Sequence, residues 1–181
     1  MSKPTTIKEA ITNWQEKFKQ AASEAHDVSL QLQWPPIEKM DSSLSELKEC
    51  RKLSLSTNAI EKITGLSSLT NLKILALSRN RIKHLTGIET LANTLEELWI
   101  SYNLIENLKP IEAMKILRVF YVSHNNVKDW MEFNRMAVPP LQAISFVGNP
   151  LQETLTDDAY KAEVKRRLPR ATTLDGDPLI R

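Results

Sequence analysis

Side chains that could carry out chemistry are few in this 181-residue sequence, and their spacing does not group them. The three histidines, His26, His84 and His124, fall at unrelated positions and show none of the short spacings of a zinc site. The single cysteine, Cys50, excludes an internal disulfide and a site built from several thiolates. The Asp-Gly-Asp run at 175–177 lacks the other ligands of a calcium loop. We therefore expect no enzymatic activity, no metal and no cofactor.

Composition and charge exclude further classes of function. The four glycines lie too far apart to build a glycine-rich phosphate loop. The net charge is +2, from 24 basic and 22 acidic residues that are interspersed along the chain. This balance argues against a nucleic-acid-binding protein. The first residues lack the apolar core of a signal peptide, and no run approaches the ~18 apolar residues of a membrane helix. We expect a reduced, soluble, intracellular protein that binds neither nucleic acid nor membrane.

An internal repeat predicts the secondary structure on which any functional residue lies. Five asparagines are separated by 22, 23, 22 and 24 residues, and each ends a phrase of the form L-x-L-x-x-N: Asn58, Asn80, Asn103, Asn125 and Asn149. The alternating apolar residues of each phrase point into a core, and the asparagine amide can bond backbone groups that the following turn leaves unpaired. The pattern is a leucine-rich repeat, which must stack on its neighbours to bury its apolar side. It predicts an α/β fold: a right-handed solenoid of about six 22-residue repeats, with a parallel β-sheet on the concave face and helical caps at both ends.

A weaker unit at residues 28–49 precedes the first full repeat. We match its Leu30 and Leu32 to the strand leucines of later units, and a Trp-Pro-Pro turn at 34–36 replaces the asparagine turn. Cys50 falls where later units carry leucine, so we interpret it as a small core residue rather than a reactive thiol.

Both ends of an open solenoid need caps. Thr6 and Glu9 form a capping-box pattern, and five apolar residues then share one helical face: Ile7, Ala10, Ile11, Trp14 and Phe18. This helix should cover the first strand, although it could instead bind a partner. At the other end a helix begins near 156–158, its buried face is Tyr160, Val164 and Leu168, and Pro169 stops it. The basic run at 165–167 suits the end of this helix as a solvated face, or could contact an acidic partner. We divide the chain into an N-terminal cap (1–27), a solenoid (28–152) and a C-terminal cap and tail (153–181).

The predicted concave face is where the sequence indicates a binding site. Residues between the inward leucines should form rows across parallel strands about 4.8 Å apart. An apolar and aromatic group on the central strands, around Trp99 and Tyr121, is bordered by serines and a few charges, which is typical of a protein-binding surface. The predicted protein-binding residues are Lys52, Ile74, Ala76, Arg79, Glu97, Trp99, Ser101, Tyr102, Val119, Tyr121 and Val147. The alternative is that Trp99 and Tyr121 only pack on one another, or that a terminal segment covers them.

Several runs are more specific than the repeat itself. TTIKEA at 5–10, PPIEKMD at 35–41, LSLSTN at 53–58, TLEELWISYN at 94–103 and VGNPL at 147–151 resemble the leucine-rich-repeat light chains of axonemal outer-arm dynein. The resemblance covers nearly the whole chain. Family members continue past a Leu-Asp-Gly turn, here at 174–176, as a projecting tail. This sequence ends at Arg181, so no contact of that tail is carried over.

The resemblance implies a non-catalytic subunit in the cytoplasm and cytoskeleton, in the axoneme of cilia and flagella. It implies binding to an outer-arm dynein heavy chain at the microtubule-binding domain on the stalk tip, with control of motor–microtubule affinity and, as a further role, tubulin contact. The family's concave sheet faces the heavy chain, which maps onto Trp99, Tyr121 and their neighbours. Basic residues such as Arg79, Arg81, Lys83 and the 165–167 run would then lie near acidic tubulin surface.

Two other classes with similar repeats and a similar C-terminal cap stay open as alternatives. One is a leucine-rich-repeat regulatory subunit of a protein phosphatase, which generally has more repeats and a more acidic concave face. The other is a ribonucleoprotein assembly factor, which would be nuclear, and the basic run at 165–167 is the strongest localisation signal available for it.

Overall fold

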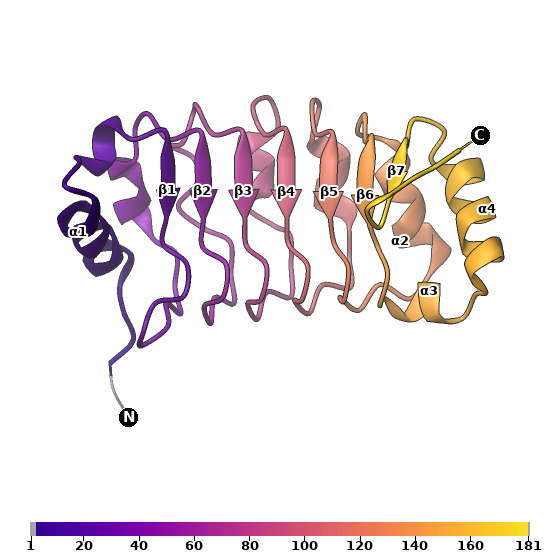
Figure 1. Cartoon of the computed structure of the whole chain (residues 1–181), viewed down its shortest axis with the longest axis horizontal. Helices are drawn as coiled ribbons and strands as arrows, with labels where there is room; N and C mark the ends of the chain where they lie inside the picture. Colours follow the sequence, from indigo (N-terminus) through magenta and orange to yellow (C-terminus); the bar gives the residue numbers. More distant parts are fainter. Residues whose placement is uncertain (1–2, 181) are drawn as a thin grey trace.

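The strands of this computed structural model, which describes residues 3–180, form one sheet in chain order (Figure 1). Neighbouring strands are parallel from β1 to β7, and β8 returns antiparallel to β7. The strands are β1 (Asp27–Ser29), β2 (Lys52–Ser54), β3 (Ile74–Ala76), β4 (Glu97–Trp99), β5 (Val119–Tyr121), β6 (Ala143–Ser145), β7 (Thr173–Leu174) and β8 (Asp177–Pro178).

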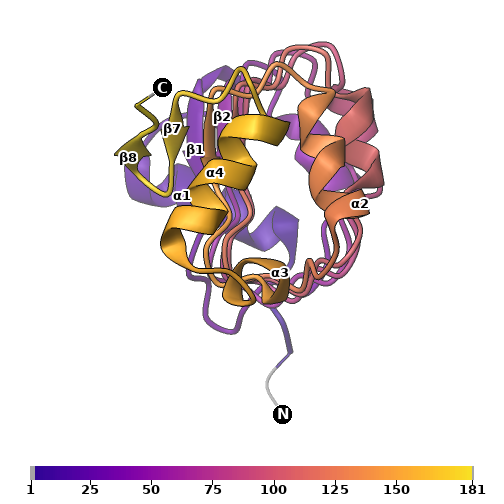
Figure 2. The same cartoon turned by 90° about the vertical axis from the view of Figure 1, so that its right-hand side faces the viewer.

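Short helices and 3₁₀ turns lie opposite the sheet and at its ends. The end-on view shows the sheet on one side and α2 on the other, with the repeats enclosing the space between (Figure 2). The α-helices are α1 (Ile7–Phe18), α2 (Trp130–Asn134), α3 (Pro150–Glu153) and α4 (Asp157–Arg167). The 3₁₀ helices are η1 (Ala22–Glu24), η2 (Ser42–Glu46), η3 (Ile88–Leu91), η4 (Lys109–Ala113) and η5 (Arg135–Ala137). None of the helices in residues 3–180 has the length and apolar character needed to cross a bilayer.

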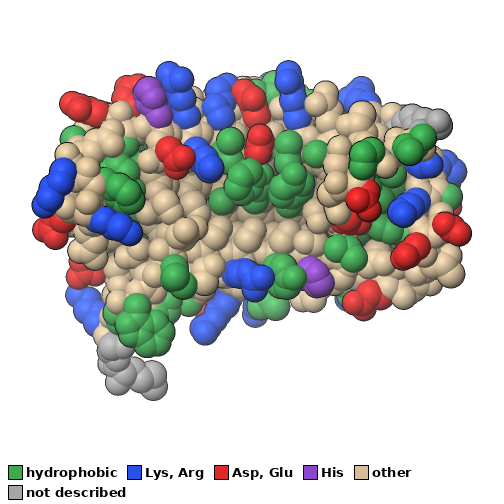
Figure 3. Space-filling model, in the orientation of Figure 1, with side chains coloured by type: hydrophobic (Ala, Val, Ile, Leu, Met, Phe, Trp, Pro, Cys, Tyr) green, Lys and Arg blue, Asp and Glu red, His purple; other side chains and the backbone are tan. Residues whose placement is uncertain are grey.

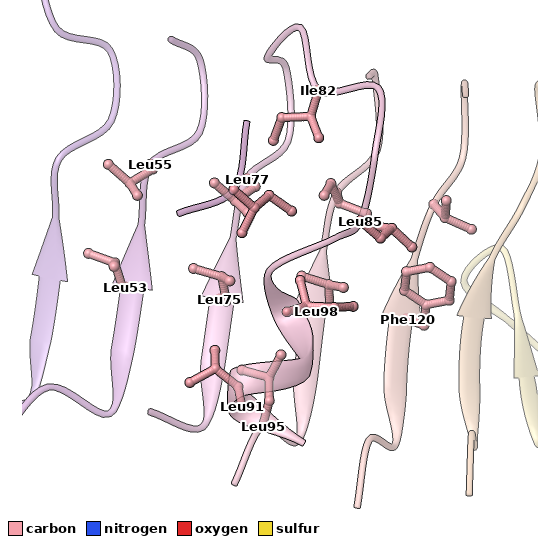
Figure 4. Close-up of a cluster of buried hydrophobic side chains, with 14 of the residues drawn as sticks. Leu53, Leu55, Leu75, Leu77, Ile82, Leu85, Leu91, Leu95, Leu98 and Phe120 are labelled. Atoms are coloured by element: carbon pink, nitrogen blue, oxygen red, sulfur yellow. The ribbon is translucent and has the colours of Figure 1, made fainter. Parts of the chain in front are cut away.

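One hydrophobic core runs the length of the solenoid. The central residue of each strand from β2 to β6 is paired in register with its neighbours and is at most 1% exposed: Leu53, Leu75, Leu98, Phe120 and Ile144. Figure 4 shows several of these side chains meeting others from the opposite wall, such as Leu85 and Leu91. This arrangement confirms the predicted leucine-rich-repeat solenoid, in which each repeat completes the core of its neighbour.

The asparagine ladder links successive repeats through their backbones. The Asn103 amide nitrogen donates to the carbonyls of Leu77 (3.0 Å) and Ile100 (3.1 Å), and its oxygen accepts from the Ile82 N–H (2.9 Å). The other four asparagines, Asn58, Asn80, Asn125 and Asn149, repeat this pattern. Each side chain therefore pairs backbone groups of two repeats that the turn would otherwise leave unsatisfied.

The first repeat has a register different from the one we expected. Val28 pairs with Leu53, so Val28 and Leu30 occupy the inward positions, and Leu32 is 72% exposed. The prediction for Leu32 was wrong because the turn is longer here. Seven positions separate Leu30 from Ile37, against five between Leu55 and Ile60. Ile37 nevertheless donates its N–H to Asn58, as Ile60 does to Asn80, so the turn absorbs the difference.

The N-terminal cap is the amphipathic helix α1. The capping box between Thr6 and Glu9 is present, and the side chains of Ile7, Ala10, Ile11 and Trp14 are buried. Phe18, expected on the same face, is 53% exposed. The helix ends at Lys19 in a left-handed conformation, and Phe18 only packs beside Trp14, with ring centroids 5.0 Å apart.

In the C-terminal cap, side chains cover the end of the core and make hydrogen bonds that a further repeat would otherwise provide. Tyr160, Val164 and Leu168 are buried, as predicted. The Asp175 carboxylate accepts hydrogen bonds from the Phe146 N–H (2.8 Å) and from the Tyr160 hydroxyl (3.0 Å). In earlier repeats the amide equivalent to Phe146 donates to a carbonyl of the next strand, for example Leu77 to Trp99. The Asp175 carboxylate thus takes the place of the strand carbonyl that would accept this hydrogen bond in an earlier repeat.

Candidate protein-binding face

The outward residues of β3, β4 and β5 form two rows on the concave face, which is the face of the sheet turned away from the core. Strand register aligns Ile74 with Glu97 and Val119 in one row, and Ala76 with Trp99 and Tyr121 in the other. The Trp99 and Tyr121 rings are stacked, with centroids 6.2 Å apart and planes 24° apart. We call Ile74, Trp99, Val119 and Tyr121 the central apolar patch. Each of the four is half-buried.

The described terminal segments leave this patch open. Figure 1 places α1 beyond β1 and the β7–β8 hairpin beside β6, at opposite ends of the sheet. Figure 3, in the same orientation, shows large hydrophobic side chains gathered over the central strands and reaching the surface. One alternative considered above, cover by a terminal segment, therefore does not hold for residues 3–180. The mutual packing of Trp99 and Tyr121 does occur.

Polar neighbours hold Trp99 in place. Its indole N–H donates to the Glu97 carboxylate at 3.0 Å, and the Lys52 ammonium lies 5.4 Å from the centroid of its ring. This cation–π contact crosses β3, where the small side chain of Ala76 leaves room. Ala76 itself is 3% exposed, so it offers almost no surface to a partner. The indole is thus oriented before any partner arrives.

A polar border surrounds the patch. Lys52 also lies 3.9 Å from Asp27, an exposed ion pair that contributes little to stability. On the side of the strand ends, the Ser123 hydroxyl donates to the Ser101 hydroxyl at 2.8 Å. Val147, also among the predicted residues, is 39% exposed one repeat further along. The arrangement is an apolar centre with a polar rim, which can exclude water from a protein contact.

Arg79 and Tyr102 stand apart from the patch, on the edge where the strands end. The residues before the first four asparagines of the ladder have left-handed backbones, with φ between 51° and 58°: Thr57, Arg79, Tyr102 and His124. The Arg79 guanidinium carbon lies 4.3 Å from the Tyr102 ring centroid, and the Tyr102 and His124 rings are stacked 4.3 Å apart. His124 was missing from the predicted site. Its shared repeat position with Arg79 and Tyr102 is the signal that could have identified it.

The groups considered for chemistry remain separate. Cys50 is fully buried, and burial raises the pKa of its thiol to about 11, so it is protonated at neutral pH. Among residues 3–180, no three His, Cys, Asp or Glu side chains come together as a metal site would require.

Known proteins similar to this chain have names that agree with one another. Dynein axonemal light chain 1 of Bos taurus is 54% identical over 183 residues, which cover 100% of this chain and 96% of the bovine protein. The Homo sapiens protein of the same name is also 54% identical, with the same coverage. The Chlamydomonas reinhardtii protein is 47% identical over 99% of this chain and 93% of its own length. No family model matches the chain.

Solved structures with a similar fold include a leucine-rich-repeat protein and an internalin, both from bacteria. One from Leptospira interrogans has a TM-score of 0.62 and 26% identity, covering 81% of this chain and 36% of that protein. Internalin C2 of Listeria monocytogenes has a TM-score of 0.56 and 21% identity, covering 76% of this chain and 59% of that one. These similarities support the fold alone.

Proposed function

Because the chain belongs to the dynein axonemal light chain 1 family, we propose that its concave face binds the motor region of an outer-arm dynein heavy chain, at the microtubule-binding domain of the stalk tip. The family's name makes the chain a dynein light chain of the axoneme, in agreement with the localisation expected from the sequence. Its relatives carry neither a phosphatase nor a ribonucleoprotein name, so no observation favours those two alternatives.

The observation that carries the proposal is the open central apolar patch. Trp99 and Tyr121 stand half-buried on a regular sheet, inside a rim of serine and charged side chains. Tryptophan and tyrosine, together with arginine, are enriched among the residues that dominate the binding energy of interfaces. An apolar patch on the central strands is a surface that a partner would cover.

The geometry also suggests how the partner would be held. The asparagine ladder and the core make the sheet rigid, and contacts to Glu97 and Lys52 already orient Trp99. A pre-organised surface loses little conformational entropy on binding. A heavy-chain element docked here would be fixed relative to the solenoid, and a light chain beside the track-binding surface would alter the affinity of the motor for its microtubule. Tubulin contact through basic side chains is a further part of this proposal.

The direct experiment is a binding assay with recombinant stalk-tip fragments of each outer-arm heavy chain. Trp99→Ala should weaken binding by ~2 kcal/mol or more, about thirtyfold in dissociation constant. Trp34→Ala is the matched control, because Trp34 is 89% exposed and lies in the turn of the first repeat. A folded Trp99→Ala protein that bound its fragment like the wild type would refute the proposed face.

Regulation needs its own measurement. A motor fragment that contains the stalk should pellet with microtubules to a different extent when the light chain is added, and Trp99→Ala should reduce the difference. Equal microtubule affinity with and without bound wild-type light chain would refute the regulatory role and leave the binding role standing.

A further inference from the structure

The edge where the strands end carries chemistry unlike that of the central apolar patch. We call five residues that flank the asparagine ladder on this edge the edge strip: Arg79, Arg81, Tyr102, Leu104 and His124. Tyr102 is 44% exposed and Leu104 is 41% exposed. Along this lower edge, Figure 3 shows basic, hydrophobic and histidine side chains next to one another.

Three side chains of the strip are already ordered by stacking. Tyr102 lies between the Arg79 guanidinium and the His124 ring, at 4.3 Å from each. The rings of Tyr102 and His124 are nearly parallel, with 12° between their planes. Stacking occupies the faces of these groups and leaves the polar atoms at their edges available, because no hydrogen bond within residues 3–180 engages their side chains.

Gly148 ends the row and seats His124. A Cβ atom at this position would lie 2.3 Å from the Nδ1 of His124, and the glycine has φ +78°, which few other residues adopt. The imidazole therefore lies against bare backbone at the next repeat. The backbone at Gly148 thus forms the end of the edge strip beside His124.

Charge indicates the kind of ligand. The residues immediately before the five asparagines of the ladder, and those immediately after them, include no aspartate or glutamate: Thr57, Arg79, Tyr102, His124 and Gly148 before, and Ala59, Arg81, Leu104, Asn126 and Pro150 after. Neither Arg79 nor Arg81 forms an ion pair with a carboxylate of residues 3–180. In contrast, three basic residues elsewhere in the molecule, Lys73, Arg135 and Arg167, each have an acidic partner within 3.1 Å.

We propose that the edge strip is a second binding site, for an extended acidic peptide segment lying across the strand ends. The carboxylates would meet the unpaired guanidinium groups of Arg79 and Arg81, which present planar forks of donors suited to carboxylate. Apolar atoms of the peptide would pack on Tyr102 and Leu104. This site deepens the proposed function and rests on it, because Arg79 and Arg81 are among the basic side chains proposed to contact tubulin. It differs from the central apolar patch in the ligand that it selects.

The test uses the full chain and a fluorescein-labelled oligoglutamate peptide, with fluorescence anisotropy as the readout and an oligoglutamine peptide for comparison. Arg79→Gln should weaken oligoglutamate binding about tenfold, and Tyr102→Ala, which removes the plane between Arg79 and His124, about fivefold. Arg118→Gln is the matched control. It removes the same charge from an exposed arginine that precedes β5, at the opposite end of the strands. Trp99→Ala should leave peptide binding unchanged, which separates this site from the proposed heavy-chain face.

Three results would overturn the proposal. The first is unchanged peptide binding by a folded Arg79→Gln protein. The second is an equal loss in Arg118→Gln, which would mean unspecific attraction to a basic protein. The third is displacement of the peptide by an equal concentration of single-stranded DNA with the same dependence on Arg79, which would assign the strip to nucleic acid.

Discussion

The two faces of the same strands place different demands on their side chains. In β4 and β5, Leu98 and Phe120 are fully buried, while Trp99 and Tyr121, the next residues along, are half-buried on the concave face. All four are large and apolar, so their residue types alone do not separate them. Inward residues therefore stabilise the fold by filling the core, whereas outward ones are available to a partner. Four sets of measurements test this contrast.

The largest effect is expected from the inward row. Phe120→Ala should lower the free energy of unfolding by ~3–5 kcal/mol, because it removes buried area and leaves a cavity between stacked repeats. Tyr121→Ala, one residue further, should cost about 1 kcal/mol, mainly through its ring contact with Trp99. Urea denaturation of both variants measures the two values. Similar losses would mean that the concave face is part of the structural core.

The asparagine ladder should rank second. Asn103→Ala removes an amide that is 5% exposed and leaves the Ile82 N–H and the Leu77 carbonyl without this partner, at a cost of ~2–3 kcal/mol. Asn93→Ala, at an exposed position outside the ladder, should stay within about 0.5 kcal/mol of the wild type. Thermal and urea unfolding provide the comparison, and a neutral Asn103→Ala would show that the turn does not need the side chain.

Trp99→Ala should cost less stability than either of these. The side chain makes one hydrogen bond to Glu97, a cation–π contact with Lys52 and a ring contact with Tyr121. All three partners are half-exposed, so we expect a loss of about 1–2 kcal/mol. The informative quantity is the ratio between this loss and the loss of heavy-chain binding. A stability loss as large as that of Phe120→Ala would place Trp99 in the core and weaken the distinction between the faces.

The smallest effect concerns Cys50, an inward residue that can titrate. Burial raises the pKa of its thiol from 9.0 to about 11. Between these values the unfolded chain gives up its proton while the folded protein keeps it, so stability falls as pH rises through this interval. Urea denaturation at pH 8 and pH 10 should show a larger decrease in the wild type than in Cys50→Ala. Equal decreases would contradict the burial of the thiol.

Much of the fold could be predicted because each repeat presents the same pattern. The L-x-L-x-x-N phrase identified every strand from β2 to β6, and the capping box located the start of α1 at Ile7. The errors fell where periodicity ends. Leu32 was misplaced by the longer first turn, and Phe18 by the left-handed end of α1, since neither depends on the repeat.

The candidate site was only partly accessible from sequence. Alternation showed which residues face outward, and so predicted that Trp99 and Tyr121 are neighbours. It could not show that Lys52 reaches across β3 to the indole, or that Ala76 is covered. The division of the chain at 27 and 152, and the binding roles of the predicted residues, stay predictions.

The inward apolar residues, the asparagine turns and the family could be identified without coordinates, because each corresponds to a local pattern or to a run of matching residues. Which outward side chains lie in contact follows from the three-dimensional packing of the repeats. Arg79, Tyr102 and His124 are separated by 23 and 22 positions in the chain, and they become neighbours because each repeat returns to the same edge. Side-chain stacking between repeats depends on rotamers and on the space left by residues such as Gly148 and Ala76. The repeat pattern of the sequence does not show how much space these small residues leave, because that space forms only when the repeats pack together.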